Sequence, residues 1–384
     1  MISETTALMT LARLALGKMT PHAVKMIYDR VTDIDNEKTA TLITEHRNDI
    51  QQLLPDIGTE TARLLQQELT AIMPMAEEEE QWCQNNKVHI ITIDDKRYPD
   101  RLRHCDDAPL VIFAKGETDL NVPHTLSIVG TRQCTTYGQD VITHMVRDLA
   151  EKCPGIMIVS GLAYGVDIYS HRAAMNNGLS TVGVVAHGLD TLYPAMHRND
   201  ANKMVLGNGA VVTEYFRGTR PVQRNFLQRN RIIAGMSDAT LVVESASHGG
   251  SLVTARIAQE YNREVLAVPG PVNSDYSIGC NNLIRDSKAA LVSSATDIIN
   301  VMGWHDARTL SKARHDGIER ELFVDMTPEE TRVTEALQKD GDCQANMLAM
   351  TTGMSIATVS SALFSLEMKG VVKALPGSTY HLIS

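Results

Sequence analysis

The chain of 384 residues lacks several features that would assign it to a class at once. It has no run of about 18 apolar residues such as a membrane span needs. Its N-terminus, with an early Glu4, lacks the basic segment and cleavage site of a signal peptide. Six cysteines are scattered without a CxxC pair, so we expect no zinc or other metal site and no disulfide framework. These absences predict a cytoplasmic protein that does not bind membranes.

Aromatic residues are also scarce, at 4% of the chain, whereas apolar residues make up 43% and charged residues 21%, as in folded globular proteins. This length exceeds one ordinary core, so we expect two or three domains. The formal net charge of −10 excludes a protein coated in positive charge. Residues 120–300 nevertheless hold 15 Lys and Arg against 14 Asp and Glu, so acidic flanks surround a nearly neutral centre.

One segment, residues 215–237, contains no Asp or Glu but holds five arginines, which we call the arginine island: Arg217, Arg220, Arg224, Arg229 and Arg231. Arginine suits phosphate oxygens and stacks on bases, and aromatic side chains are interleaved here, which predicts a groove for a polymer of phosphates. The alternative is a surface that pairs with the acidic flanks of the chain. On a helix Arg229 and Arg231 lie about 200° apart, so we expect only one, Arg231, to lie near the phosphates.

The first 80 residues read as short helices. Thr20 and Pro21 have the pattern of a helix N-cap followed by a first-turn proline, and Gly58 precedes another apolar-periodic helix. A small helical domain is therefore expected over residues 1–80. It resembles a SAM-like or helix-hairpin-helix unit, although a plain packing domain fits as well. The acid-rich run at residues 76–86 is expected to be a solvated helical face.

Residues 88–302 alternate β-rich runs with helical segments. The runs are 88–93, 109–116, 125–130, 155–161, 181–186, 210–215, 239–244, 264–270 and 289–293. Apolar strands separated by helices predict a mainly parallel sheet covered on both faces. The fold class is therefore a doubly wound α/β domain.

The remaining residues divide into a polar linker, 303–326, and a small unit, 327–384. Thr327 and Glu330 have the spacing of a capping box, and two more helices and a hairpin around Pro376 and Gly377 complete a winged-helix pattern. The would-be reading helix has no Arg or Lys before Lys369, and the unit holds 4 Lys and Arg against 6 Asp and Glu. We therefore favour a protein-contact or structural role over reading of duplex DNA.

Small-residue loops follow four predicted strands, at the edge where a doubly wound sheet binds ligands. Their key residues are Gly130, Thr131, Arg132; Ser160, Gly161, Tyr164, Gly165; Gly249, Gly250, Ser251; and Asn281. Most of these loops lead into helices, whose free N–H groups attract anions. A phosphate-bearing ligand is predicted. The GxGxxG and GxxxxGK[ST] patterns are absent, which disfavours an ordinary NAD enzyme or P-loop ATPase.

Candidates for catalysis exist, but no Ser–His–Asp or metal-ligand set is complete. They are Asp167, His171, His187, Glu214 and Glu244. We favour structural roles, with Asp167 orienting its loop and His171 packing beneath it. An alternative is a nucleotide hydrolase or phosphoribosyl-handling enzyme, because residues 247–251 distantly resemble a PGGxGT loop. A sensor of a small nucleotide is another alternative.

Six ordered motifs resemble the DprA (Smf) family of DNA-processing proteins over about residues 95–300. They are RYPDRL…APLVIFAKG, SIVGTRxxTxYG, VSGLAYGVDIYSHRAA, FLQRNRIIAGMS, VVESASHGGSLVTARIA and VPGPVNSDYSIGCNNLI. The N-terminal helices and the winged-helix pattern resemble accessory domains of that family more loosely. Tyr164 departs from the family pattern, which usually has Arg there; the change removes a phosphate contact or supplies a ring that stacks on a base.

The resemblance implies a bacterial cytosolic protein that binds and protects incoming single-stranded DNA during natural transformation and helps load the RecA recombinase. It implies an extended Rossmann core that forms a homodimer, no cofactor and no catalysis. Its DNA pocket would use Arg132 and the segment around Phe226 to Arg231. With the loop residues, the expected DNA-binding set also includes Arg224, Phe226, Arg229, Asn230 and Arg231. Asp167, His171 and Glu244 are expected to support the pocket.

Overall fold

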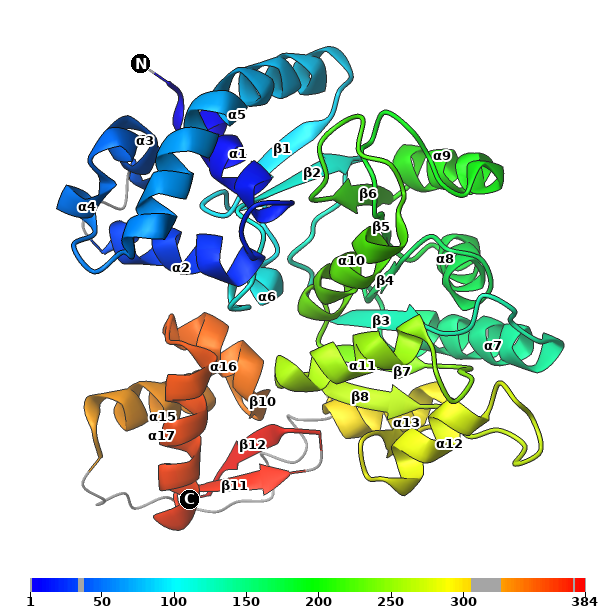
Figure 1. Ribbon diagram of the computed structural model, residues 1–384. Helices are drawn as coiled ribbons and strands as arrows, with labels where there is room; N and C mark the ends of the chain where they lie inside the picture. The colour runs from blue at the N-terminus through cyan, green and yellow to red at the C-terminus, as the bar shows by residue number, and fades with distance from the viewer. Residues whose placement is uncertain (1, 34–37, 305–325, 376, 384) are drawn as a thin grey trace.

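The computed structural model describes residues 2–33, 38–304, 326–375 and 377–383, and shows N-terminal helices, a large sheet flanked by helices, and a C-terminal unit (Figure 1). Most of the predicted polar linker, 303–326, lies outside the described residues. Within the described ranges no single helix is long and apolar enough to cross a membrane. One pair, bent by 113°, meets that test by length and composition only: Ala345–Thr352 with Ile356–Met368.

The N-terminal region is helical, as predicted. Its helices are α1 (Glu4–Ala15), α2 (Pro21–Thr32), α3 (Thr39–Glu45), η1 (His46–Asn48), α4 (Ile50–Leu53) and α5 (Thr59–Asn85). Thr20 caps α2 by accepting a hydrogen bond from the backbone N–H of Ala23 at 3.2 Å. The acid-rich run is not wholly solvated, because Glu79 is 3% exposed and accepts from the backbone N–H of Arg217 at 2.8 Å. That part of the prediction is wrong, since α5 lies against the sheet domain there.

All nine predicted strands form, and they make one sheet in the order β1-β2-β6-β5-β4-β3-β7-β8-β9. The bounds are β1 (His89–Thr92), β2 (Val111–Lys115), β3 (Thr125–Val129), β4 (Met157–Ser160), β5 (Thr181–Val184), β6 (Gly209–Thr213), β7 (Ala239–Val242), β8 (Glu264–Ala267) and β9 (Ala290–Leu291). β2 runs antiparallel to both of its neighbours. The seven strands from β6 to β9 in sheet order are parallel to one another. The predicted mainly parallel α/β fold is confirmed.

Helices cover both faces of this sheet, because alternate strand residues point to opposite sides. The helices are α6 (Asp100–Arg103), α7 (Thr136–Lys152), α8 (Val166–Asn176), η2 (Ala195–His197), α9 (Arg198–Leu206), α10 (Gln223–Gly235), α11 (Gly250–Glu260), α12 (Ile278–Arg285) and α13 (Ala295–Met302). Val129 and Val242 face the core shared with α10, α11 and the N-terminal helices. Their neighbours Ile128 and Leu241 face the core formed with α7, α8 and α13.

The C-terminal unit is a winged helix, as predicted. It consists of α15 (Pro328–Asp340), β10 (Cys343–Gln344), α16 (Ala345–Thr352), α17 (Ile356–Met368), β11 (Val372–Leu375) and β12 (Thr379–Leu382). The capping box is present: Thr327 accepts from the N–H of Glu330 at 3.3 Å, and Glu330 accepts from the N–H of Thr327 at 2.8 Å. The unit has its own core, which includes Leu348 and Leu363.

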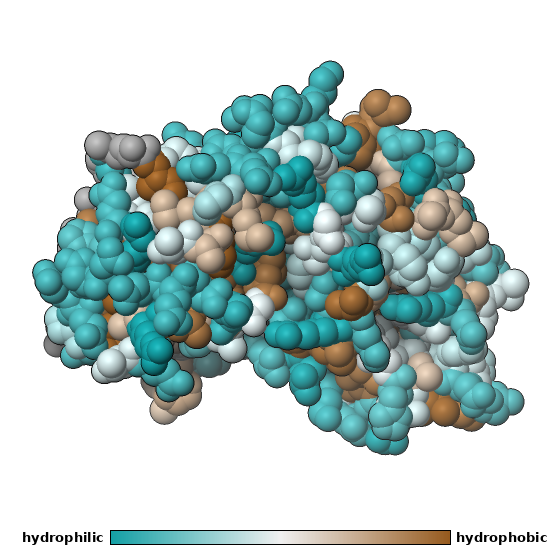
Figure 2. All heavy atoms as spheres, turned by 45° about the horizontal axis from the view of Figure 1, so that its top comes forward, coloured by the Kyte–Doolittle hydropathy of each residue, from teal (hydrophilic) through white to brown (hydrophobic). Residues whose placement is uncertain are grey.

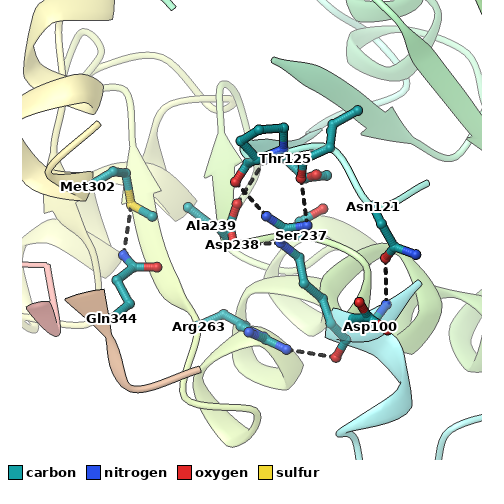
Figure 3. A network of polar contacts seen from close by, with 12 residues as sticks. Asp100, Asn121, Thr125, Ser237, Asp238, Ala239, Arg263, Met302 and Gln344 are labelled. Atoms are coloured by element: carbon teal, nitrogen blue, oxygen red, sulfur yellow. Dashed lines mark hydrogen bonds and ion pairs between the residues drawn. The ribbon is translucent and has the colours of Figure 1, made fainter. Parts of the chain in front are cut away.

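A buried polar network closes the amino-terminal edge of the central strands (Figure 3). Arg101, 2% exposed, forms an ion pair with Asp238 at 2.6 Å, and Asp238 accepts from the N–H of Thr125 at 2.8 Å. Arg263 donates to the carbonyl of Arg101 at 2.8 Å. These contacts hold the segment before β2 against the starts of β3 and β7. The opposite, carboxyl edge carries the small-residue loops.

The winged helix contacts the sheet domain close to this network. The side-chain amide of Gln344 lies 3.7 Å from the sulfur of Met302 (Figure 3). Gly377 approaches α13 so closely that a Cβ atom there would lie 1.6 Å from the carbonyl oxygen of Val301. The winged helix therefore docks on the side of the sheet domain away from the carboxyl-edge loops.

Candidate nucleic-acid interface

A pocket of about 590 Å³ lies at the carboxyl edge of β3, β4 and β7, between α10 and the start of α11. The parallel strands bring together loops that are far apart in sequence. Ten of the predicted residues line this pocket: Gly130, Thr131, Arg132, Asp167, Phe226, Arg229, Asn230, Gly249, Gly250 and Ser251. The loops after β3 and β7 and the helix of the arginine island therefore share one cavity. The surface seen in Figure 2 is mostly hydrophilic, with hydrophobic residues in separate small patches.

Four residues predicted to bind DNA support the pocket without lining it. Ser160 donates to the carbonyl of Ile128 at 2.6 Å and joins the ends of β3 and β4. Asn281 donates to the carbonyl of Gly270 at 2.9 Å and holds the loop after β8. The other two are glycines at close approaches: a Cβ on Gly161 would lie 2.3 Å from Nη1 of Arg229, and Gly165 has φ +73°.

Arg229 reaches the pocket from beneath. It is 4% exposed, and its Nη1 donates to the carbonyl oxygens of Gly161, at 2.7 Å, and Val184. Its Nε has no hydrogen-bond partner among the described residues. Burial lowers the pKa of Arg229, and nearby Asp167 opposes this shift. A buried cation that lacks a full set of partners is suited to an anionic ligand.

Asp167 is the carboxylate that lies closest to this arginine in the pocket. It accepts from the backbone N–H groups of Gly161 at 3.1 Å and Ala163 at 3.3 Å. Burial raises the pKa of Asp167, and the charge of Arg229 partly offsets that effect. Asp167 therefore orients its loop, in keeping with its expected supporting role.

Arg231 points to the other side of α10, so Arg229 lines the pocket and Arg231, which we expected nearer the phosphates, does not. It is 5% exposed and donates to the carboxylate of Glu214 and to the carbonyl of Asp107. Burial alone would lower the pKa of Arg231, but the carboxylates of Glu214 and Asp107 outweigh it and raise the pKa. The direction of α10 relative to the sheet decides which arginine faces the pocket.

The other three arginines of the arginine island also differ in whether they form ion pairs. Arg217 pairs with Glu78 at 3.1 Å and Glu79 at 3.3 Å, both on α5. For this residue the alternative expectation, pairing with the acidic flanks of the chain, is met. Arg220 and Arg224 are exposed, and neither has an ion pair within the described parts of the chain. These two leave positive charge on the surface at the start of α10.

Phe226 joins the cationic side chains at the rim of the pocket. The Arg132 guanidinium lies 5.4 Å from the centre of its ring, and that of Arg229 lies 6.0 Å away. The ring of Tyr193, in the loop after β5, is 5.8 Å from the same ring. Tyr164 is 38% exposed and packs edge-on against His197 at 5.1 Å. Tyr193 was not among the predicted residues, although β5 also ends at the carboxyl edge.

The remaining candidates for catalysis hold parts of the fold. His171 contacts the hydroxyl of Thr181 at 2.7 Å, and burial, followed by the charges of His197 and Arg229, lowers its pKa to about 3. Glu244 accepts from the backbone N–H and the hydroxyl of Thr135, at 2.8 and 2.6 Å. His187 accepts from the N–H of Tyr193, and Glu214 pairs with Arg231. Among the described residues no group of three or more metal-ligating side chains occurs.

At glycines 249 and 250, at the start of α11, a Cβ atom would meet only ordinary van der Waals contacts. The nearest atoms to a Cβ would be 3.6 Å away for Gly249 and 3.9 Å away for Gly250. At Gly130, in contrast, a Cβ would lie 2.4 Å from Val166 and 2.8 Å from the carbonyl of Glu244. Gly130 is therefore needed for packing, whereas Gly249 and Gly250 keep the pocket wall and the first N–H groups of α11 accessible.

Comparison with known proteins assigns the family. The family model described as DNA recombination-mediator protein A matches residues 89–303, and the model of the DprA winged helix domain matches residues 323–378. The chain belongs to the DprA/Smf family. The DprA resemblance noted in the sequence motifs is thereby confirmed, and the match includes the winged helix.

Relatives in the DprA/Smf family are similar over most of this chain. The putative DNA processing protein DprA of Mycobacterium tuberculosis is 35% identical over 301 residues, which is 75% of each chain. Protein Smf of Escherichia coli is 34% identical, over 78% of this chain and 79% of that protein. The crystal structure of DprA from Streptococcus pneumoniae superposes with a TM-score of 0.64 and 29% identity, over 78% of this chain and 97% of that one.

Proposed function

We propose that this chain binds single-stranded DNA, without reading its sequence, in the pocket between α10 and α11. The observation that carries the proposal is the meeting of Arg132, Arg229 and Phe226 with the open start of α11 in one cavity. DNA processing protein A of Helicobacter pylori, whose structure concerns a single-stranded DNA binding mode, supports it. That structure has a TM-score of 0.50 and 27% identity, over 59% of this chain and 97% of that one.

The chemistry of the pocket suits a nucleotide strand rather than a duplex. Guanidinium groups and helix N–H groups contact phosphates, and an aromatic ring stacks on any base, so neither contact depends on sequence. A duplex reader would instead insert a helix with basic side chains into the major groove. α17 of the winged helix carries no Lys or Arg within its bounds, so the pocket is the better candidate.

We further infer that the bound strand is handed to the RecA recombinase during natural transformation, and that the chain acts as a homodimer in the bacterial cytoplasm. The family's description as a recombination mediator supports this inference. The proposed role is that of a binding protein without catalysis. Formation of RecA filaments on a single strand, with and without this protein, tests the RecA step separately from strand binding.

Oligo-dT binding at two salt concentrations, combined with a sizing measurement, tests ligand class and oligomeric state together. The affinity is expected to fall steeply with salt, because arginine–phosphate contacts release counterions. A duplex of equal length should bind more weakly. Tight duplex binding, or equal affinity at both salt concentrations, would contradict the proposal. Release of a base from nucleoside monophosphates that stops in Asp167→Asn would favour a nucleotide hydrolase instead.

A further inference from the structure

We propose that the loop of residues 188–197 carries a base-stacking site, centred on Tyr193, for an unpaired nucleobase next to the nucleotide held in the pocket. The inference rests on the proposed function and extends it. It assigns to this loop the task of telling a single strand from a duplex. Bases in a duplex are already stacked on one another and cannot offer a face to a protein ring without leaving the stack.

The first observation is the position of the Tyr193 ring. It is 41% exposed, and the centre of its ring lies 5.8 Å from that of Phe226, with the two planes inclined at 59°. Phe226 lines the pocket, and the Arg132 guanidinium lies 5.4 Å from its ring. The Arg132 guanidinium, the Phe226 ring and the Tyr193 ring therefore form a continuous row of contacts. A nucleotide strand has phosphates and bases to match both kinds of group.

The second observation is that the loop is held in place at both ends by buried histidines. His187 accepts from the backbone N–H of Tyr193 through Nε2 at 3.1 Å, so its Nδ1 carries the proton that it donates to the carbonyl of Gly188 at 2.9 Å. His197 donates from Nδ1 to the carbonyl of Leu162 at 3.0 Å. Both imidazoles are nearly inaccessible, at 0% and 3% exposed.

A third set of contacts fixes the loop against the segment that leads into α10. Gly188 donates its N–H to the carbonyl of Thr219 at 3.2 Å, and the carboxylate of Asp190 accepts from the N–H of Gly218 at 3.0 Å. The Tyr193 ring is thus presented by a braced loop. A ring held in place before binding loses little conformational freedom when a base stacks on it.

The neighbouring surface favours a nucleobase as the occupant. Leu227, which lines the pocket, is 45% exposed, so apolar surface continues from the pocket to the outside. Arg220 and Arg224, which have no ion pair among the described residues, are exposed at the start of the same helix, where they attract the phosphates of the strand. An exposed ring and exposed cations on neighbouring segments match a strand whose bases and phosphates alternate. The Tyr193 site therefore suits the same chemical class of ligand as the pocket, a nucleotide strand.

The experiment compares two ligands and three variants of the full chain. The ligands are oligo-dT and an oligonucleotide of equal length in which every sugar lacks its base. Tyr193→Ala is expected to weaken oligo-dT binding about tenfold, in line with the measured value of one stacked base, and to leave binding of the abasic strand unchanged. Tyr193→Phe should bind both ligands like the native chain. Phe364→Ala removes a 67% exposed ring on α17 and should change neither.

The outcomes separate this proposal from the proposed function. If native protein fails to bind oligo-dT, both fall. If Arg132→Ala weakens oligo-dT binding but Tyr193→Ala does not, the pocket stands and the stacking site is overturned. If Tyr193→Ala lowers the affinity for oligo-dT and for the abasic strand equally, the stacking site is also overturned. Tyr193 would then act through the geometry of its loop and not through a contact with a base. Melting temperatures of the variants identify any loss that comes from unfolding.

Discussion

On one side of α10, Arg229 lines the pocket, and on the other side Arg231 lies in a closed ionic cluster. The two residues are separated by one asparagine, and both are about equally buried. Arg229 donates to two backbone carbonyls and has no ion pair among the described residues, whereas the Nε atoms of both arginines lack a hydrogen-bond partner there. Arg231 faces two acidic residues, and its attraction to Glu214 raises its pKa despite burial. On one side of the helix the guanidinium has backbone carbonyls and the nearby Asp167, and on the other side it forms ion pairs with Glu214 and Asp107.

The difference teaches that an arginine-rich segment in an acidic protein need not be one binding surface. Arg231 and Arg217 find acids within the chain, whereas Arg229, Arg220 and Arg224 do not have a carboxylate ion pair among the described residues. Charge counting along the sequence treats all five alike. Burial and the direction of each side chain separate a stabilising pair from a ligand contact.

The largest expected effect is on stability, from the closed side of the helix. Arg231→Ala leaves Glu214 buried without its partner, so the free energy of unfolding should fall by about 3–5 kcal/mol. Chemical denaturation measures this loss. The matched double variant Arg231→Met with Glu214→Leu removes both charges and should recover much of it. A stable Arg231→Ala protein that binds oligo-dT poorly would mean that Arg231 acts on the ligand after all.

The next effect is on binding, from the open side of the pocket. Arg132→Ala should weaken oligo-dT binding about tenfold and reduce the slope of log affinity against log salt by about 1, because one phosphate contact is lost. Arg132 is exposed, so its replacement should change the free energy of unfolding by less than about 0.5 kcal/mol. Arg147→Ala on α7, also an exposed arginine, is the matched control and should bind normally.

A pair of glycine variants sharpens the same contrast without changing charge. In Gly250→Ala the nearest contact of the new methyl group outside its own helix is the side chain of Asn230, at 3.9 Å, so stability should hold. Oligo-dT binding should weaken severalfold, because the methyl narrows the approach to α11. Gly130→Ala should instead destabilise the protein by about 1–3 kcal/mol, because its methyl meets Val166 and the Glu244 carbonyl. Normal oligo-dT affinity in Gly250→Ala would argue against strand contact at α11.

The smallest effect is expected at Arg217, whose side chain pairs with acids on α5. Arg217→Ala should cost about 1 kcal/mol: the pair with exposed Glu78 contributes little, and buried Glu79 loses its side-chain partner but keeps the backbone N–H of residue 217. Oligo-dT affinity should be close to that of the native chain. A loss of oligo-dT affinity as large as that of Arg132→Ala would mean that Arg217 contacts the ligand. The distinction between arginines paired with acids and arginines that face the ligand would then be wrong.

Much of the fold followed from local pattern, because short apolar runs bounded by glycine and polar residues report buried parallel strands directly. All nine strands and the winged helix were predicted for that reason. The pocket wall was partly predictable, since loops after parallel strands meet at one edge. Tyr193 was missed because its contact with Phe226, which is distant in sequence, leaves no local pattern in the chain. The burial of Glu79 was missed because an acid-rich helical run gives no sign of a distant backbone N–H partner.

By itself, the sequence determined the order of strands and helices, the loops at the carboxyl edge and the concentration of arginine in one acid-free segment. Hydrophobic periodicity and turn residues act over a few neighbouring positions, so they can be read along the chain. Only the tertiary structure decided that Arg229 faces the pocket and Arg231 faces Glu214. That choice depends on the rotation of α10 against the sheet, which the packing of its apolar residues sets through contacts distant in sequence.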